Sequence, residues 1–263
     1  MFSPPALLVS AILGVFLFSG GAEALASPVR DLPVLTDNAL YRSGKIKSSK
    51  CPDGALSTQS FADARRTIVG LWGCLNASWS AHAKRAKLPF APAKLVVLSK
   101  PKQFCGKKWQ KNINARYCFT TRTMAILVDE DYYLRTRVIY HFQYIAGLYG
   151  RHLQSLTGIA NGHGALSYKS ETERLEQARR GTLQADCLGG VFLGSVWKSA
   201  GHDSEGWPAL LELVKGNADY NYDHKKDRRF ARGKNIVHWL DRGFRSGDPG
   251  SCRTWTAPSS RVS

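Results

Sequence analysis

The histidines in the middle of the chain are the first candidates for metal chemistry, because imidazole nitrogen is a common metal ligand. His141 and His152 lie eleven residues apart, a spacing that places both on one side of a helix. The helical rise separates them by about 16 Å, so one ion cannot bind both. His163 could approach His152, with Asp186 as a third ligand, which leaves a rearranged metal site open.

Two other kinds of site are not supported by the sequence. No Gly-x-Ser-x-Gly elbow for a nucleophilic serine is present. The spacing of Asp219, Asn221 and Asp223 is similar to the start of a calcium loop. However, His224 stands where that loop needs glycine, and Phe230 stands where it needs a bidentate carboxylate. We therefore reject the calcium-loop interpretation.

A long helix over residues 138–159 must position most of these groups. Its apolar residues recur at three- and four-residue spacing, which is typical of a buried stripe on a helix. These residues are Val138, Phe142, Ile145, Tyr149, Leu153 and Leu156. A second helix is predicted to begin at Ser170, where Ser170 and Glu173 fit a capping box, and it carries Asp186.

These two helices carry a resemblance to a known family. Residues 147–154, Gly-Leu-Tyr-Gly-Arg-His-Leu-Gln, resemble the zinc helix of the bacterial neutral zinc metallopeptidases, which typically reads His-Glu-Tyr-Gly-His-His-Val-Gln. Residues 182–191, Thr-Leu-Gln-Ala-Asp-Cys-Leu-Gly-Gly-Val, are similar to the family's Glu-Leu-Gln-Ala-Asp-Cys-x-Ala-Gly-Val. The steps Cys105-Gly106, Tyr117-Cys118 and Val128-Asp129 also follow the family order. The similarity covers about residues 105–255, and more loosely the region from Asn38.

The resemblance implies a catalytic zinc, but this chain replaces the residues that would hold it. In the family, two histidines four residues apart and a downstream glutamate bind zinc, and a second glutamate is the general base. Here Gly147 and Arg151 stand at the two histidine positions. Leu148 stands at the base position and Thr182 at the third-ligand position. His152 matches a family histidine that does not bind metal.

Arginine at the second ligand position argues most strongly against zinc. Its guanidinium is always protonated and has no lone pair to donate, and a cation close to a divalent ion costs several kcal/mol. Asp186, which matches a supporting aspartate of the family, is an alternative salt-bridge partner for Arg151. We therefore predict no zinc cofactor and no catalytic residues at this degenerate site. The remaining alternatives are an active metallopeptidase with a rearranged metal site and a basic module that binds anionic polymers.

Charge and composition limit the partners. The chain has 263 residues, 37 Lys and Arg against 20 Asp and Glu, and a formal charge of +17. This excess favours anionic partners such as cell-wall polymers or lipid headgroups, although charge alone can also keep a secreted protein soluble. No nucleic-acid motif stands out, so the partners expected are a peptide in the old cleft or an anionic envelope polymer on the basic surface.

The N-terminus is predicted to direct export. Residues 6–18 form an apolar run of signal-peptide length, which is too short to span a bilayer comfortably. Small residues near Ala24 and Ala26 offer cleavage sites, so residues 1–26 are predicted to be a signal peptide. The absence of Lys and Arg before the run keeps an uncleaved anchor open. The mature protein is expected to be secreted or associated with the cell envelope, without a membrane span.

Six cysteines in an exported chain predict three disulfides, and no C-x-x-C pair suggests a zinc site. Six cysteines allow fifteen pairings, so spacing does not determine the connectivity. Sequence order suggests Cys51 with Cys74 and Cys105 with Cys118, which leaves Cys187 with Cys252.

The element pattern predicts an α+β fold of the zincin-like type. A small twisted sheet that includes residues 94–99 and 123–129 is expected to pack on the two central helices. An extra N-terminal helix is expected over residues 60–87. The predicted organisation is an extended N-terminal arm over residues 27–59, one metallopeptidase-like domain over residues 60–255 and a tail over residues 256–263.

Overall fold

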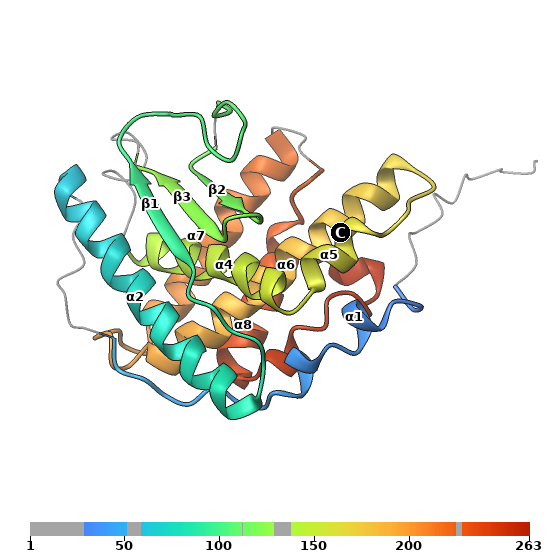
Figure 1. Ribbon diagram of the computed structural model, residues 1–263, viewed down its shortest axis with the longest axis horizontal. Helices are drawn as coiled ribbons and strands as arrows, with labels where there is room; N and C mark the ends of the chain where they lie inside the picture. The colour runs from blue at the N-terminus through green and yellow to red at the C-terminus, as the bar shows by residue number, and fades with distance from the viewer. Residues whose placement is uncertain (1–28, 52–58, 112, 129–137, 225–227) are drawn as a thin grey trace, which may run out of the picture.

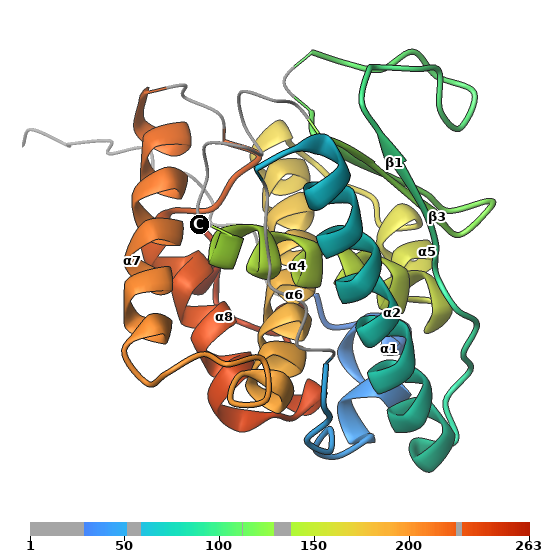
Figure 2. The same ribbon diagram turned by 90° about the vertical axis from the view of Figure 1, so that its left-hand side faces the viewer.

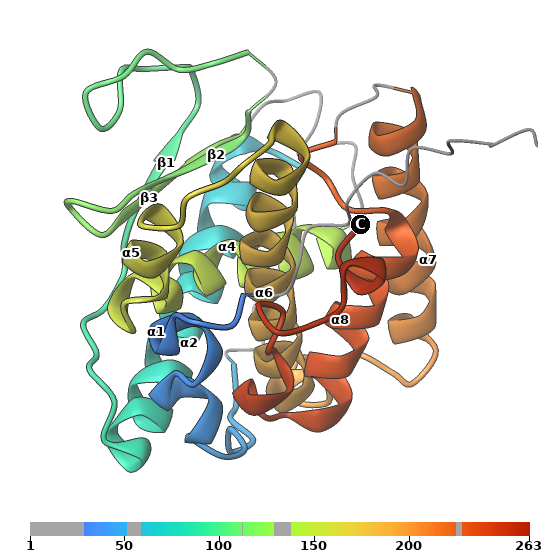
Figure 3. The ribbon, with the colours of Figure 1, turned by 90° about the vertical axis from the view of Figure 1, so that its right-hand side faces the viewer.

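The computed structural model describes residues 29–51, 59–111, 113–128, 138–224 and 228–263, and its centre is the helix α6 (Glu171–Val196). Figures 2 and 3 show α6 between two groups of elements. The sheet and α2 (Phe61–Ala86) lie on one side, and α4 (Val138–Leu156) crosses α6. The helices α7 (Gly206–Asp219) and α8 (Gly233–Ser246) lie on the other. These helices and the small sheet confirm the predicted α+β class.

The sheet is small and mixed. Its strands are β1 (Lys94–Leu98), β2 (Ala115–Cys118) and β3 (Thr123–Leu127), in the order β1-β3-β2. β3 is parallel to β1 and antiparallel to β2. Because β3 is central, all five of its residues are buried. Figure 1 shows the sheet above α4 with α2 along its edge.

The predicted long helices form close to their expected bounds, because their ends carry local signals. The Ser60 side chain accepts a hydrogen bond from Asp63 N at the start of α2, and Ser170 accepts one from Glu173 N at the start of α6. α4 ends at Leu156, and the left-handed Gly158 (φ +78°) leads into the short α5 (Ile159–Gly164). The predicted strand residue 129 lies outside the described residues.

The described part of residues 27–59, predicted as an extended N-terminal arm, contains two one-turn helices and packs on the core. This segment contains α1 (Pro33–Thr36) and the 3-10 helix η1 (Ala39–Arg42), and Leu35 and Leu40 are buried in the main core. Asn38 connects the segment to the turn after α4, because its amide donates to Thr157 O at 3.0 Å. One-turn helices are too short for a periodic pattern, so the sequence does not reveal them.

The last residues are also part of the core and not a separate tail. The short helices η3 (Pro249–Ser251) and η4 (Ser259–Arg261) follow α8, and Val262 has no exposed surface. Between α7 and α8 lies η2 (Tyr220–His224), a π-helical turn. The disulfides are Cys51–Cys74, Cys105–Cys118 and Cys187–Cys252, the pairing that sequence order suggested.

Two expectations concern the membrane. The predicted signal peptide, residues 1–26, lies outside the described residues. Within the described part of the chain, no helix combines the length and apolar composition needed to cross a bilayer.

Candidate functional site

The two helices that carry the metallopeptidase-like motifs cross at glycines. A Cβ atom added to Gly150 would lie 2.4 Å from Ala185 O, and one added to Gly189 would lie 2.7 Å from Gly147 N. Real Cβ atoms do not make such contacts, so only glycine permits α4 and α6 to approach this closely. The crossing brings residues 147–154 and residues 182–186 together.

Asp186 fills the space beside Gly147, the residue that the proposed resemblance aligns with a first zinc ligand. A Cβ atom added to Gly147 would lie 2.8 Å from Asp186 Oδ1. A histidine at this position would therefore have to displace the aspartate. The neighbouring Leu148 packs against the hydrophobic core with its partly buried side chain. Neither position offers a metal donor.

Arg151 on α4 and Thr182 on α6 contact each other directly. Arg151 Nη2 donates to Thr182 Oγ1 at 2.7 Å, and the threonine hydroxyl donates onward to Ala178 O at 3.0 Å. The alternative in which Arg151 forms a salt bridge with Asp186 is wrong, since no ion pair within 4.0 Å joins these two described residues. Thr182 and Asp186 lie one turn apart on α6, and Arg151 faces the first of them.

Burial shifts the pKa values of Arg151, Asp186 and Tyr144. It lowers the pKa of the Arg151 guanidinium, and the charge of Asp186 partly offsets this effect. Burial raises the pKa of the Asp186 carboxyl to about 6, against the opposing effect of Arg151. Burial also raises the pKa of the Tyr144 hydroxyl on α4, with smaller contributions from Tyr140 and Asp186. The site therefore contains a cation and a carboxyl group that are both poorly solvated.

Replacing Asp186 by asparagine is expected to flatten the dependence of stability on pH. The pKa of Asp186 in the folded chain lies above its unfolded value of 3.8, so the folded chain binds the proton more tightly. The stabilisation of the folded chain by protonated Asp186 is greatest below the unfolded pKa. It is lost as the pH rises through about 6. Urea unfolding should show that Asp186→Asn gains on the order of 1–3 kcal/mol relative to wild type between about pH 4 and pH 7. Parallel pH profiles would contradict a desolvated carboxyl group.

His152 is a structural residue. Its Nε2 donates to Ala91 O at 2.7 Å, and its Nδ1 accepts from the Tyr117 hydroxyl at 2.8 Å. The side chain is fully buried, and this burial lowers its pKa. Both ring nitrogens are therefore occupied in joining α4 to β2 and to the segment before β1. The sequence indicated neither partner, because both lie far from His152 along the chain.

The rearranged metal site does not assemble. His163, on α5, packs its ring against Trp255 at 5.1 Å between ring centroids and lies beside Arg151. Within the described ranges, no group of three or more His, Cys, Asp or Glu side chains is placed to hold a metal ion. The residues at the four family positions also do not fit zinc, because none of them supplies a suitable donor. That the protein contains no zinc stays a prediction.

A small cavity of about 50 Å³ lies beside Arg151. Its lining comes from the hairpin after β2, from α4 and α5, and from the C-terminal segment. The lining residues are Phe119, Arg151, Gln154, Ile159, Ala160, His163 and Trp255. The sequence analysis named Arg151 and His163 as candidate site residues but not the others. Trp255 lies more than one hundred positions from Arg151, and no local pattern connects residues that far apart.

The floor of this cavity is a buried polar network. Gln154 Nε2 donates to Gln184 Oε1 at 2.9 Å, and Trp255 Nε1 donates to the same oxygen at 3.2 Å. Gln184 Nε2 in turn donates to the Tyr41 hydroxyl at 2.6 Å. This network fixes the walls around the Arg151 guanidinium, so the cavity is preformed.

Comparison of the whole chain with protein-family models, with curated proteins and with solved structures found no match to any of them.

Proposed function

We propose that the chain is a secreted, metallopeptidase-like protein without peptidase activity that binds a peptide at the cell envelope. The observation that carries the proposal is the Arg151 guanidinium beside a small preformed cavity at the position of the second zinc ligand. Three disulfides are typical of proteins from oxidising compartments, which supports an extracellular or envelope location.

The chemistry of the cavity favours a carboxylate. Arginine presents a planar fork of donors that matches a carboxylate, and Thr182 occupies only part of this fork. A volume of about 50 Å³ is larger than one water molecule, whose share of the liquid is about 30 Å³, and is sufficient for one carboxylate group. The indole of Trp255 and the ring of Phe119 add apolar walls. A peptide that ends in a free carboxylate fits this combination.

The proposal is tested with a pair of peptides that differ only at their C-terminus. Titration calorimetry of the purified mature protein should detect a peptide with a free carboxylate, selected from a peptide library, and about 10- to 100-fold weaker binding of its C-terminal amide. Arg151→Gln should lose the preference, whereas Arg174→Gln, which changes an exposed arginine on α6, should keep it. Equal binding of acid and amide would contradict the carboxylate site.

Zinc content separates this proposal from the active-enzyme alternative. Elemental analysis of the purified mature protein should find less than stoichiometric zinc, because Arg151 stands where a neutral imidazole is needed. Stoichiometric zinc that survives dialysis would support a rearranged metal site instead. So would chelator-sensitive cleavage of casein that is lost on changing His152 or Asp186.

A further inference from the structure

A basic groove runs along α8 on the side of α6 away from the α4 crossing. It has a volume of about 760 Å³ and shares no residue with the cavity beside Arg151. Its lining comes from α7, α8, η3 and η4. The lining residues are Leu211, Lys234, Val237, His238, Asp241, Arg242, Arg245, Ser246, Ser251 and Arg261.

The cations of the groove on α8 form one stripe. They are Lys234, Arg242 and Arg245, and the imidazole of His238 lies between them. The intervals of four, four and three residues place all four side chains on one face of α8. The rise of the helix spreads Lys234 and Arg245 over about 16 Å along its axis. Arg261 adds a further cation from η4. A single small anion cannot contact both ends of this stripe.

Most of this positive charge is not neutralised within the protein. Asp241, the one carboxylate in the lining, accepts from Arg245 Nε at 2.7 Å and from Trp207 Nε1 at 2.8 Å. Among the described residues, no carboxylate forms a salt bridge with Lys234, Arg242 or Arg261. All three of these side chains belong to exposed residues, so they are available to a ligand.

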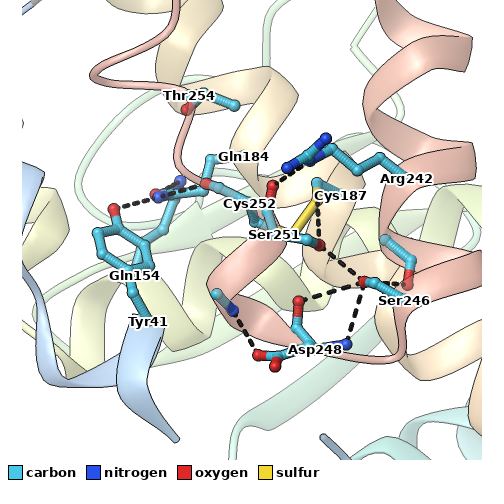
Figure 4. The surroundings of a disulfide bond; sticks show 12 residues. Tyr41, Gln154, Gln184, Cys187, Arg242, Ser246, Asp248, Ser251, Cys252 and Thr254 are labelled. Carbon is cyan, nitrogen blue, oxygen red and sulfur yellow. Dashed lines mark hydrogen bonds between the residues drawn. A yellow bond between two sulfur atoms is a disulfide. The ribbon is translucent and has the colours of Figure 1, made fainter. Parts of the chain in front are cut away.

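Hydrogen bonds and a buried disulfide hold this wall of the groove in shape. Arg242 Nε donates to Ser251 O at 2.9 Å, and the hydroxyls of Ser246 and Ser251 are 2.8 Å apart (Figure 4). The Cys187–Cys252 disulfide lies next to Ser251 and joins this wall to α6 (Figure 4). The Arg242 guanidinium is therefore oriented by a cross-linked segment, which lowers the entropic cost of binding.

Arg261 is positioned from the other end of the groove. The buried Trp239 donates from its Nε1 to Arg261 O at 2.9 Å, which holds η4 against α8. His238 lies between the cations: its pKa is lowered first by burial and then by Arg261 and Arg242, while Asp241 acts in the opposite direction. The pKa of the His238 imidazole therefore depends on the positive potential of the groove.

We infer that this groove binds an extended phosphodiester polymer that carries no bases, such as a polyol phosphate of a cell envelope. Arginine and lysine are the usual phosphate-binding side chains, and a polymer places its charges along the whole stripe. Nucleic acid is the less favoured occupant, because no Phe, Tyr or Trp lines the groove and single strands bind largely by stacking on such rings. The inference does not depend on the peptide site beside Arg151.

The test compares two triple variants of the full mature chain with the same net charge. Lys234→Gln, Arg242→Gln and Arg261→Gln together change the groove, whereas Arg65→Gln, Arg66→Gln and Lys84→Gln change exposed cations on α2. Fluorescence anisotropy with labelled poly(glycerol phosphate) should show at least ~10-fold weaker binding for the groove variant. The slope of log K against log salt should also fall by about 2, at about 0.7 for each lost contact.

Two further measurements distinguish binding in the groove from diffuse attraction to the surface and from nucleic-acid binding. Poly(glycerol phosphate) should raise the pKa of His238, followed by NMR, in the wild type and in the α2 variant but not in the groove variant. Equal loss of affinity in both triple variants would mean diffuse attraction to the surface and would overturn the inference. Tighter binding of single-stranded DNA, lost in the groove variant alone, would overturn the assignment to a polymer without bases. Two controls test whether the variants fold. One is the single exposed change Lys234→Gln, and the other is the melting temperature of each variant.

Arg151→Gln keeps the two proposals separate. This variant should leave the binding of poly(glycerol phosphate) unchanged, because Arg151 lies outside the groove lining. Loss of peptide binding with retained polymer binding would support two sites. Loss of polymer binding in Arg151→Gln would contradict the location on α8.

Discussion

Alanine in place of Gly243 is expected to destabilise the protein by about 3 kcal/mol or more, because α8 and α6 touch backbone to backbone at this residue. A Cβ atom added to Gly243 would lie 2.0 Å from Cys187 O and 3.1 Å from Val191 N. Neither backbone atom can rotate away, and Cys187 is also held by its disulfide to Cys252. The helices must therefore separate, which opens the core between them.

The opposite result is expected for the same substitution at Gly73. This glycine lies within α2, and a Cβ atom added to it would meet nothing within 4 Å. Glycine inside a helix costs about 0.5–1 kcal/mol relative to alanine, so Gly73→Ala should stabilise the protein by about that amount. Urea unfolding measures both variants. Similar free energies of unfolding for Gly243→Ala and Gly73→Ala would rule out the close contact of α6 with α8.

Arg180→Met is the second substitution with a large expected effect, a loss of about 3–5 kcal/mol. Arg180 has only 1% of its surface exposed and lies 2.6 Å from Glu176 Oε1. Its Nη1 donates to three carbonyl oxygens of the C-terminal segment, those of Thr254, Trp255 and Ala257. Methionine would leave a buried carboxylate without its cation and three carbonyl groups without their donor.

Two further variants identify the cause of that loss. Arg174→Met removes a second Arg–Glu pair from the same helix, but this pair with Glu171 is exposed and should give no measurable change in the free energy of unfolding. Adding Glu176→Gln to Arg180→Met should recover part of the stability, because it removes the unpaired charge. A double variant no more stable than Arg180→Met would place the loss in the C-terminal carbonyl contacts alone.

The three long helices α2, α4 and α6 and the strands β1 and β3 were predictable because their signals are local. The apolar stripe of α4 and the serine caps of α2 and α6 lie within a few residues of the structure that they specify. α1 and η1 were not predictable, because helices of four residues carry no period and take their stability from burial. The same reason applies to η4, which the sequence analysis placed in a tail.

Some features of the candidate site likewise follow from the sequence, and others follow only from the tertiary structure. The sequence by itself determined that the side chains of residues 147, 148, 151 and 182 do not form a set of zinc ligands, since their chemistry does not depend on the fold. Only the tertiary structure decided that Arg151 binds Thr182 and that Arg261 joins the stripe on α8. Such contacts depend on how closely helices approach, and here glycines far apart in the sequence set that distance.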